Sequence, residues 1–271
     1  MKYKMLITDL DGTLLRNDKT ISTYTYDVLK KLHEQNVEIV VSSGRSFLSI
    51  PPCIRDLDLI NYYICCNGAN IKDKKNNNYI YKKEIKNETC ISILNYVKQY
   101  DVFVDCSIDD VAYVERNKFE HLWENLHDKY LVDSISKSRK PHDDLYSEKR
   151  NFQKIEFFIQ DDVFRTGLQQ RLVDMYPDDI DAIVSYKTNF ELGPKGANKG
   201  AASKFLCDYL HIDTKDIIVC GDNPNDIPAL SIAGLKIVTA NGDDRDKKIA
   251  DILALNCNED GIARAIDENV L

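Results

Sequence analysis

The sequence predicts an α/β protein in which a doubly wound parallel sheet carries an inserted α+β segment. Near both ends of the 271-residue chain, short apolar runs rich in β-branched residues alternate with amphipathic stretches of helical period. Such alternation favours parallel strands joined by right-handed helical crossovers. In the long middle section, predicted strands follow one another directly, which favours antiparallel pairing instead.

The elements of the α/β part are assigned from their hydrophobic period. The first predicted strand is Lys4–Thr8, and Thr23–Gln35 after it has apolar residues at helical spacing. The further predicted elements are strands Val37–Val41 and Asn61–Cys66, helix Lys199–Leu210, strand Asp216–Cys220, helix Asn225–Ala233, strand Leu235–Thr239 and a short apolar run Ile252–Leu255.

The middle section is predicted to be an α+β domain over residues 83–186, inserted into a core made of 1–82 and 187–271. The hinges are placed near Lys82–Glu84 and Tyr186–Asn189, where the sequence is polar and turn-like. The predicted strands of the insertion are Val102–Cys106, Ala112–Glu115, Lys154–Ile159 and Ile180–Ser185, and its predicted helices are Glu88–Gln99, Lys118–Lys129 and Val163–Met175.

Composition excludes several classes of protein. A formal net charge of -8 argues against a nucleic-acid-binding protein, which usually carries a basic surplus. The eight cysteines form no C-x-x-C pair, so we interpret them as buried, reduced thiols rather than a zinc or redox site. We find no signal-peptide pattern and no apolar run of about 18 residues. We therefore expect a soluble, cytoplasmic protein with neither a membrane nor a nucleic-acid partner; its oligomeric state is not predicted.

Two aspartates directly follow the first predicted strand, in Asp9-Leu10-Asp11-Gly12-Thr13. Ligands bind at the carboxyl ends of strands in open α/β sheets, so both carboxylates are candidate site residues. The alternative is an Asp-Gly turn that closes a hairpin. The segment after Thr13 is polar and leads to a helix rather than to a returning strand, which disfavours that alternative.

A second acidic cluster follows the strand that ends at Cys220, in Gly221-Asp222-Asn223-Pro224-Asn225-Asp226. A helix cap is the simpler interpretation, but a cap needs only one such side chain. Clustered carboxylates repel one another, and a hard divalent cation with oxygen ligands relieves that repulsion. Asp222 and Asp226, together with Asp9 and Asp11, therefore predict a magnesium site.

Three shorter elements supply donors that suit a phosphate group. Ser43, Gly44 and Arg45 end the second predicted strand, where a hydroxyl and loop amides can hold phosphate oxygens. Lys199 stands in the first turn of a predicted helix, an unfavourable place for a cation without an anionic partner. Asn67 follows the third predicted strand. Each of these residues is also compatible with an ordinary loop.

In this order, the motifs resemble those of the haloacid dehalogenase superfamily, specifically its Cof-type branch with a type IIB cap. The resemblance covers nearly the whole chain: D-x-D-G-T, S-G-R, N-G-A, K-G and G-D-x-x-N-D appear in sequence order. It implies a Rossmann-like core with the inserted segment as the cap. The branch commonly has threonine where Ser43 stands, and serine keeps the hydroxyl.

The resemblance also implies a role for each matched residue. Asp9 would be the nucleophile and a magnesium ligand, and Asp11 the general acid and base, with its backbone carbonyl on the metal. The remaining implied roles are phosphate orientation by Ser43 and Lys199, substrate or phosphate binding by Gly44, Arg45, Asn67 and Asn225, and metal binding by Asp222 and Asp226. The implied activity is a magnesium-dependent phosphatase that forms an aspartyl phosphate and acts on a small phosphorylated metabolite, such as a sugar phosphate or a phosphorylated cofactor.

Two alternatives remain beside the phosphatase. A phosphomannomutase-like mutase shares this core and cap, but that group usually lacks S-G-R after the second strand. A catalytically inactive protein that binds phosphorylated metabolites is the other alternative, although every reactive position is filled. The sequence does not reveal the physiological substrate, and Trp123 in the predicted helix 118–129 is interpreted as a packing residue.

Overall fold

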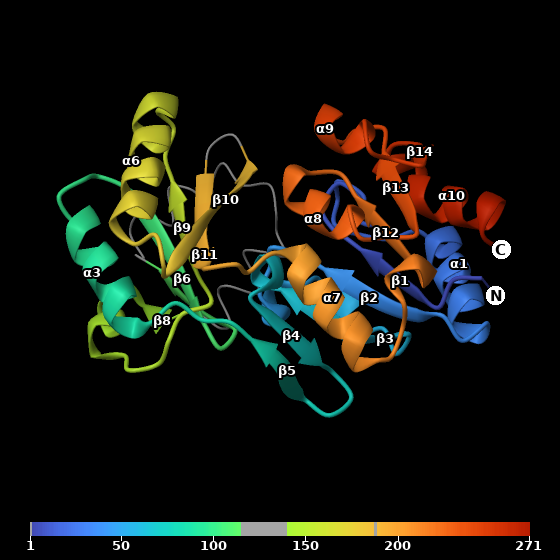
Figure 1. Cartoon of the computed structure of the whole chain (residues 1–271), viewed down its shortest axis with the longest axis horizontal. Helices are drawn as coiled ribbons and strands as arrows, with labels where there is room; N and C mark the ends of the chain where they lie inside the picture. Colours follow the sequence, from blue (N-terminus) through green and yellow to red (C-terminus); the bar gives the residue numbers. More distant parts are fainter. Residues whose placement is uncertain (1, 115–139, 187–188) are drawn as a thin grey trace. The chain divides into compact units, whose positions relative to one another are not determined.

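The computed structural model describes residues 2–114, 140–186 and 189–271. It confirms the predicted fold class, because a largely parallel sheet with helices is combined with a separate α+β unit (Figure 1). The predicted helix 118–129, with Trp123, lies outside the described residues. Within the described ranges, no helix is both long enough and apolar enough to span a bilayer.

The chain divides into two compact units. Unit 1 consists of Met1–Arg45, Pro51–Tyr81 and Asn198–Leu271, and unit 2 consists of Ser46–Ile50 and Lys82–Ala197.

Unit 1 is built on an eight-stranded sheet with the order β14-β13-β12-β1-β2-β3-β4-β5. Neighbouring strands from β14 to β3 are parallel, and β4 then pairs with β3 in the antiparallel sense. The strands are β1 Met5–Thr8, β2 Glu38–Ser42, β3 Ile60–Cys65, β4 Asn70–Asp73, β5 Asn78–Lys82, β12 Ile217–Gly221, β13 Leu235–Thr239 and β14 Ile252–Ala254. The central strand β1 is fully buried, as its uninterrupted apolar run predicts.

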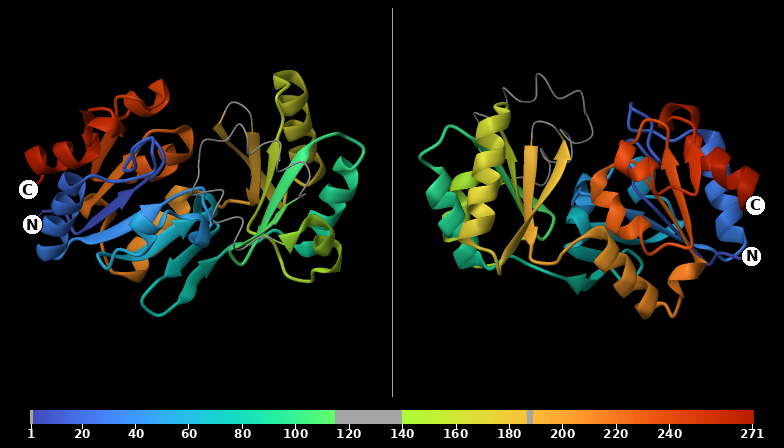
Figure 2. Two further views of the ribbon diagram at one scale, coloured as in Figure 1. Left: turned by 180° about the vertical axis from the view of Figure 1, so that it is seen from behind. Right: turned by 45° about the horizontal axis from the view of Figure 1, so that its top comes forward.

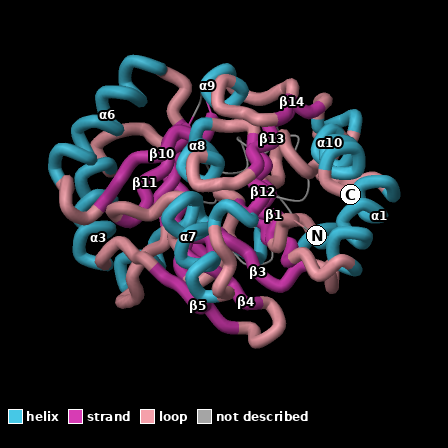
Figure 3. The backbone as a smooth tube through the Cα atoms, turned by 45° about the vertical axis from the view of Figure 1, so that its right-hand side comes forward, coloured by secondary structure: helices cyan, strands magenta, loops and turns pink. Residues whose placement is uncertain are grey.

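The helices of unit 1 bury the faces of this sheet. Met5 and Ile7 of β1 share a core with Leu206 of α7 and Leu230 of α8, while α1 and α10 lie side by side and pack beside β2 and β13 (Figure 3). The helices are α1 Thr23–Glu34, α2 Pro52–Arg55, α7 Lys199–Tyr209, α8 Ile227–Leu230, α9 Asp244–Lys247 and α10 Gly261–Asn269, with short 3-10 turns at Cys66–Gly68, Thr214–Asp216, Pro224–Asp226 and Cys257–Glu259.

Unit 2 is a six-stranded sheet with the order β10-β11-β9-β6-β7-β8. Its strands are β6 Phe103–Ile108, β7 Val111–Val114, β8 Lys140–Pro141, β9 Lys154–Phe158, β10 Ile180–Tyr186 and β11 Asn189–Pro194, and its helices are α3 Asn87–Val97 and α6 Asp162–Met175, with 3-10 turns at Phe47–Ser49 and His142–Ser147. The two helices lie on one face of the sheet and bury one hydrophobic core there (Figure 2).

The limits of unit 2 differ from the boundaries predicted from the sequence. The predicted second boundary, between residues 186 and 187, falls before β11. That strand pairs with β9 and β10, so it belongs to unit 2, which extends to Ala197. Ser46–Ile50 also belongs to unit 2, and the backbone N–H of Phe47 donates to Asp110 at 3.0 Å.

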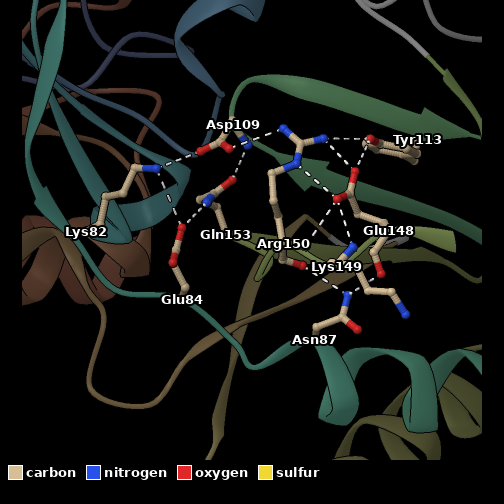
Figure 4. Close-up of polar contacts among 9 residues, drawn as sticks. All are labelled: Lys82, Glu84, Asn87, Asp109, Tyr113, Glu148, Lys149, Arg150 and Gln153. Carbon is tan, nitrogen blue, oxygen red and sulfur yellow. Dashed lines mark hydrogen bonds and ion pairs between the residues drawn. The ribbon is translucent and has the colours of Figure 1, made fainter. Parts of the chain in front are cut away.

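A polar network joins the segment 82–84 of unit 2 to the turn between β6 and β7 (Figure 4). The side chain of Gln153 accepts from the Asp109 backbone N–H at 2.6 Å and donates to Glu84 at 2.8 Å. Arg150 bridges Glu148 at 2.5 Å and Asp109 at 3.2 Å. Gln153 is 1 % exposed, so both hydrogen bonds are shielded from water. They join the segment that contains Glu84 to the turn that contains Asp109.

Candidate active site

The residues predicted to be functional follow neighbouring parallel strands of unit 1 at the same edge of the sheet. Asp9 follows β1, Ser43 follows β2 and Asp222 follows β12. β1 pairs with β2 on one side and with β12 on the other, and the Asp9 backbone N–H donates to the carbonyl of Cys220 at 3.0 Å. Parallel pairing therefore brings together residues that lie far apart in the sequence.

Three carboxylates form the centre of this edge. Oxygens of Asp9, Asp222 and Asp226 lie within 4.8 Å of one another, and all three side chains are buried. Asp226 is oriented by the loop itself, since one of its oxygens accepts the backbone N–H groups of Asp222 at 3.0 Å and Asn223 at 3.1 Å. We name Asp9, Asp222 and Asp226 the acidic triad.

Lys199 is the buried cation of the site. Its Nζ donates to Oδ1 of Asp9 and to Oδ1 of Asp226, both at 2.6 Å, and its side chain is 1 % exposed. Burial would lower the pKa of Lys199, but the charges of the two carboxylates outweigh burial and raise it. The two aspartates are thus the anionic partners that a lysine in the first turn of α7 requires.

Two members of the triad have raised pKa values, because three carboxyl groups are buried close together. Burial, only partly offset by Lys199, raises the pKa of Asp9 to about 7. Burial and the charges of Asp9 and Asp226 raise the pKa of Asp222 to about 8. One lysine does not balance three ionised carboxylates, so the triad offers converging oxygen ligands that fit a hard divalent cation.

Gly12 and Thr13 lie against the Asp222 carboxylate. Gly12 has a φ of +87°, and a Cβ at this position would lie 2.3 Å from Oδ2 of Asp222, so only glycine fits. The hydroxyl of Thr13 donates to Oδ1 of Asp222 at 2.7 Å. Asn241 donates to the Gly12 carbonyl at 2.7 Å.

Asp11 is not a member of the triad and pairs with two cations. Arg45 donates to both carboxylate oxygens, at 2.7 and 2.8 Å, and Lys19 donates to Oδ1 at 2.7 Å. Burial alone would raise the pKa of Asp11, but the charge and hydrogen bonds of Arg45, with those of Lys19, hold it well below its ordinary value. The Asp11 side chain is therefore an anion in this structure.

Ser43, Gly44, Asn67 and Asn225 occupy the loops beside the triad. The backbone N–H of Asn67 donates to the carbonyl of Ser43 at 3.1 Å, and a Cβ on Gly44 would lie 3.2 Å from the Asn67 amide. Asn225 donates to Asn67 Oδ1 at 2.9 Å. Oδ1 of Asn225 is buried and has no hydrogen-bond partner in the described chain, so it is an acceptor available to a ligand.

The structure brings most of the predicted site residues together in unit 1. Asp9, Asp222, Asp226 and Lys199 form one hydrogen-bonded group, whereas Asp11 pairs with Arg45 through its side chain. The metal role expected of the Asp11 backbone carbonyl stays a prediction.

Sequence reasoning did not assign roles to Lys19, Thr13 and Asn241. Thr13 belongs to the first motif, so its side chain was a signal that could have been used. Asn241 lies in the stretch 238–242 and Lys19 in a polar loop, and neither segment belongs to one of the five motifs.

Comparison with known proteins shows the family of this chain. A model of haloacid dehalogenase-like hydrolases matches residues 6–266. A putative phosphatase from Haemophilus influenzae is 28% identical, over 99% of this chain and 98% of its own. The 5-amino-6-(5-phospho-D-ribitylamino)uracil phosphatase YcsE of Bacillus subtilis is 26% identical, over 99% of this chain and 96% of its own.

Solved structures share the fold over almost the full length. A Thermotoga maritima protein superposes with a TM-score of 0.82 at 25% identity, over 99% of this chain and 98% of its own. A sugar phosphatase of subclass IIB of the superfamily has a TM-score of 0.81 at 20% identity, over 98% of both chains. These findings confirm the fold and family predicted from the motifs: the chain belongs to the haloacid dehalogenase-like hydrolases.

Proposed function

We propose that this protein is a magnesium-dependent phosphatase that hydrolyses small phosphorylated metabolites through an aspartyl phosphate on Asp9. The observation that carries the proposal is the position of Asp9 in the acidic triad, 2.6 Å from the buried ammonium of Lys199. A carboxylate attacks a phosphate dianion only where that negative charge is offset, and the lysine and a cation supply the offset.

The first step transfers the phosphoryl group to the protein. An oxygen of Asp9 forms a bond to phosphorus, and the bond between phosphorus and the ester oxygen breaks. The leaving alkoxide takes a proton from Asp11. Lys199 and the hydroxyl of Ser43 orient the phosphoryl oxygens, and Asn225, whose Oδ1 has no partner in the described residues, accepts a donor from the substrate.

The second step releases inorganic phosphate. A water molecule attacks phosphorus, the bond between phosphorus and Asp9 breaks, and the proton of the water returns to Asp11. In the structure Arg45 and Lys19 keep Asp11 ionised. Asp11 therefore has to exchange its contacts with these cations for contacts with the substrate before it carries a proton.

Asp9, Asp222 and Asp226 would hold the magnesium ion, because their buried oxygens are the ligand type that this cation prefers. When bound, the ion supplies positive charge that offsets the phosphate and the triad together. The Asp11 backbone carbonyl is proposed as a further ligand.

The proposed substrate class is a small sugar phosphate or phosphorylated cofactor. The names of the ribitylaminouracil-phosphate phosphatase and of the subclass IIB sugar phosphatase support this class. All eight cysteines are free thiols, which supports a reducing compartment, and we propose the cytoplasm.

The test is phosphate release from a panel of sugar phosphates and phosphorylated cofactors, with magnesium and with excess chelator. Magnesium-dependent release of inorganic phosphate supports the proposal. Conversion of a sugar phosphate into its positional isomer would favour a mutase, and binding without turnover would favour a protein that lost catalysis.

A further inference from the structure

A loop that belongs to none of the five motifs lies against Asp222 of the acidic triad. Residues 239–243 lead from the end of β13 to the start of α9. The backbone N–H of Asp243 donates to the Asp222 carbonyl at 2.7 Å, and a Cβ on Gly242 would lie 3.0 Å from the oxygen of that carbonyl. The backbone of this loop therefore packs directly on the residue that follows β12.

The same loop also holds the carbonyl of Gly12 in the first motif. The hydroxyl of Thr239 donates to this carbonyl at 3.0 Å, and Nδ2 of Asn241 donates to it at 2.7 Å. A carbonyl oxygen offers two lone pairs, so these two donors use both. They fix the orientation of the peptide group that joins Gly12 to Thr13.

Asn241 is itself oriented by a second hydrogen bond. Its Oδ1 accepts from the backbone N–H of Cys257 at 2.9 Å, while its Nδ2 donates to Gly12. The reversed amide would place oxygen against oxygen and N–H against N–H, so the two partners define one orientation. Asn241 is exposed, so these hydrogen bonds rather than burial determine where its side chain lies.

The peptide group between Gly12 and Thr13 contacts both oxygens of the Asp222 carboxylate. The Thr13 hydroxyl donates to Oδ1 at 2.7 Å, and Gly12 lies so close that a Cβ on it would be 2.3 Å from Oδ2. A rotation of this peptide group would move the Thr13 hydroxyl away from Asp222 or press Gly12 against it. The position of the Asp222 carboxylate therefore depends on the peptide group that Asn241 holds.

We propose that Asn241 is a positioning residue for the magnesium site. It holds the Gly12 carbonyl, and through the Thr13 hydroxyl it keeps the Asp222 carboxylate in place for the metal. This inference rests on the proposed function, in which Asp222 is a metal ligand. Groups that orient a metal ligand typically change metal affinity 10–100-fold when they are removed, and Asn241 acts through one further residue, so we expect a loss of about tenfold.

Asn241→Leu is the test variant, because leucine has a similar shape and can form neither hydrogen bond. Asn269→Leu is its matched control: Asn269 is exposed at the end of α10, and its amide likewise donates to a backbone carbonyl, that of Ala265, at 2.8 Å. Without metal, the side-chain carboxyl carbon signal of Asp222 in the isotope-labelled full chain should move in Asn241→Leu and stay in place in Asn269→Leu. An unmoved signal in Asn241→Leu would overturn the inference without any reference to activity.

Calorimetric titration with magnesium chloride is the second measurement. Asn241→Leu should bind magnesium about tenfold more weakly than the wild type, and Asn269→Leu should bind it equally well. The magnesium concentration that gives the half-maximal rate should rise by the same factor. A merely structural role would instead lower the rate at every concentration and leave that midpoint unchanged, which would overturn the inference. Asn241→Ala removes the same hydrogen bonds and decides if the leucine variant does not fold.

Thr13→Val tests the route from Asn241 to Asp222, because valine keeps the shape of threonine and lacks the hydroxyl. In the Thr13→Val background, Asn241→Leu should weaken magnesium binding little further, since both changes break the same chain of contacts. Fully additive losses would overturn the route through Thr13. Equal affinities in wild type and Asn241→Leu would overturn the inference alone, whereas a wild-type protein that binds no magnesium would count against the proposed function.

Discussion

Lys199 donates a 2.6 Å hydrogen bond to Asp9, although the two residues are 190 positions apart in the sequence. The contact exists because β1 is central in the sheet of unit 1 and α7 packs against it. It places a permanent positive charge beside the carboxylate proposed to attack phosphorus.

Lys199→Met should reduce kcat/KM by about 10²-fold or more, because the charge that offsets the phosphate is removed from a buried site. Initial rates at saturating magnesium measure the loss. Lys204→Met changes an exposed lysine of the same helix and serves as the control. Equal rates in both variants would remove Lys199 from the mechanism.

Asp11→Asn should cost on the order of 10²–10⁴-fold with an alkyl phosphate, the usual contribution of general acid–base catalysis. The loss should be much smaller with p-nitrophenyl phosphate, whose leaving group scarcely needs a proton. Asp27→Asn, an exposed change on α1, controls for general effects of removing a carboxylate. A loss of the same size with both substrates would contradict the proton-transfer role.

Magnesium should bind more tightly as the pH rises, because protons compete with the metal for the acidic triad. The pKa values of Asp9 and Asp222 are raised to about 7 and about 8 without a metal, so both groups lose protons when the ion binds. Calorimetry in two buffers of different ionisation enthalpy should show proton release at pH 7, and an affinity at least about tenfold higher at pH 8 than at pH 6.

Asp222→Asn tests whether magnesium binds at the acidic triad. It should weaken magnesium binding strongly, whereas Asp58→Asn, at an exposed position of the same unit, should not. An affinity that does not change with pH in the wild-type protein would argue that the triad is not the magnesium site.

Asp246→Asn should stabilise the protein at pH 8 and not at pH 4. Asp246 is fully buried, and neither of its carboxylate oxygens has a hydrogen-bond partner in the described ranges. Burial and the charge of Asp226 raise its pKa to about 6. The folded state thus holds this proton more tightly than the unfolded chain, so the stability that the neutral group allows is lost as the pH rises from about 4 through 6.

The free energy of unfolding should therefore favour Asp246→Asn over the wild type by up to about 3 kcal/mol at pH 8, at about 1.4 kcal/mol per pKa unit. Urea unfolding at both pH values measures it. Asp244→Asn, on the exposed side of the same helix, should change stability by less than about 0.5 kcal/mol. A variant that is less stable than the wild type at pH 8 would show that Asp246 is charged and paired.

Gln153→Ala should destabilise unit 2 by about 1–3 kcal/mol, because the backbone N–H of Asp109 loses its partner inside the network of Figure 4. Hydrogen exchange of the Asp109 amide should accelerate in the variant. Gln170→Ala changes an exposed glutamine of α6 and should have no such effect. Unchanged exchange at Asp109 would show that the turn is held by other contacts.

The sequence predicted the parallel sheet and the residues at its carboxyl edge, because buried strands such as Met5–Thr8 are continuous apolar runs and the motifs follow them directly. It did not predict that β11 belongs to unit 2. The segment Asn189–Pro194 contains Glu191 and ends in proline, and its place in the sheet depends on pairing with β9 and β10, which no local pattern reveals.

Side-chain partners were the other part that the sequence did not show. The bidentate contact of Arg45 with Asp11 joins two separate loops, whereas Arg45 was expected to bind substrate or phosphate. Lys19 reaches the same carboxylate from a loop without any motif. Both contacts depend on how loops fold over the sheet edge, which hydrophobic periodicity does not encode.

Trapping the phosphorylated protein tests the central claim most directly. Wild-type protein mixed with a good substrate and magnesium, then quenched in acid within one turnover, should yield a peptide that carries one phosphoryl group on Asp9 by mass spectrometry. Asp9→Asn should give no such peptide and should lose about 10³-fold or more in turnover. Near-normal turnover by Asp9→Asn, or a phosphoryl group trapped on another residue, would contradict the account.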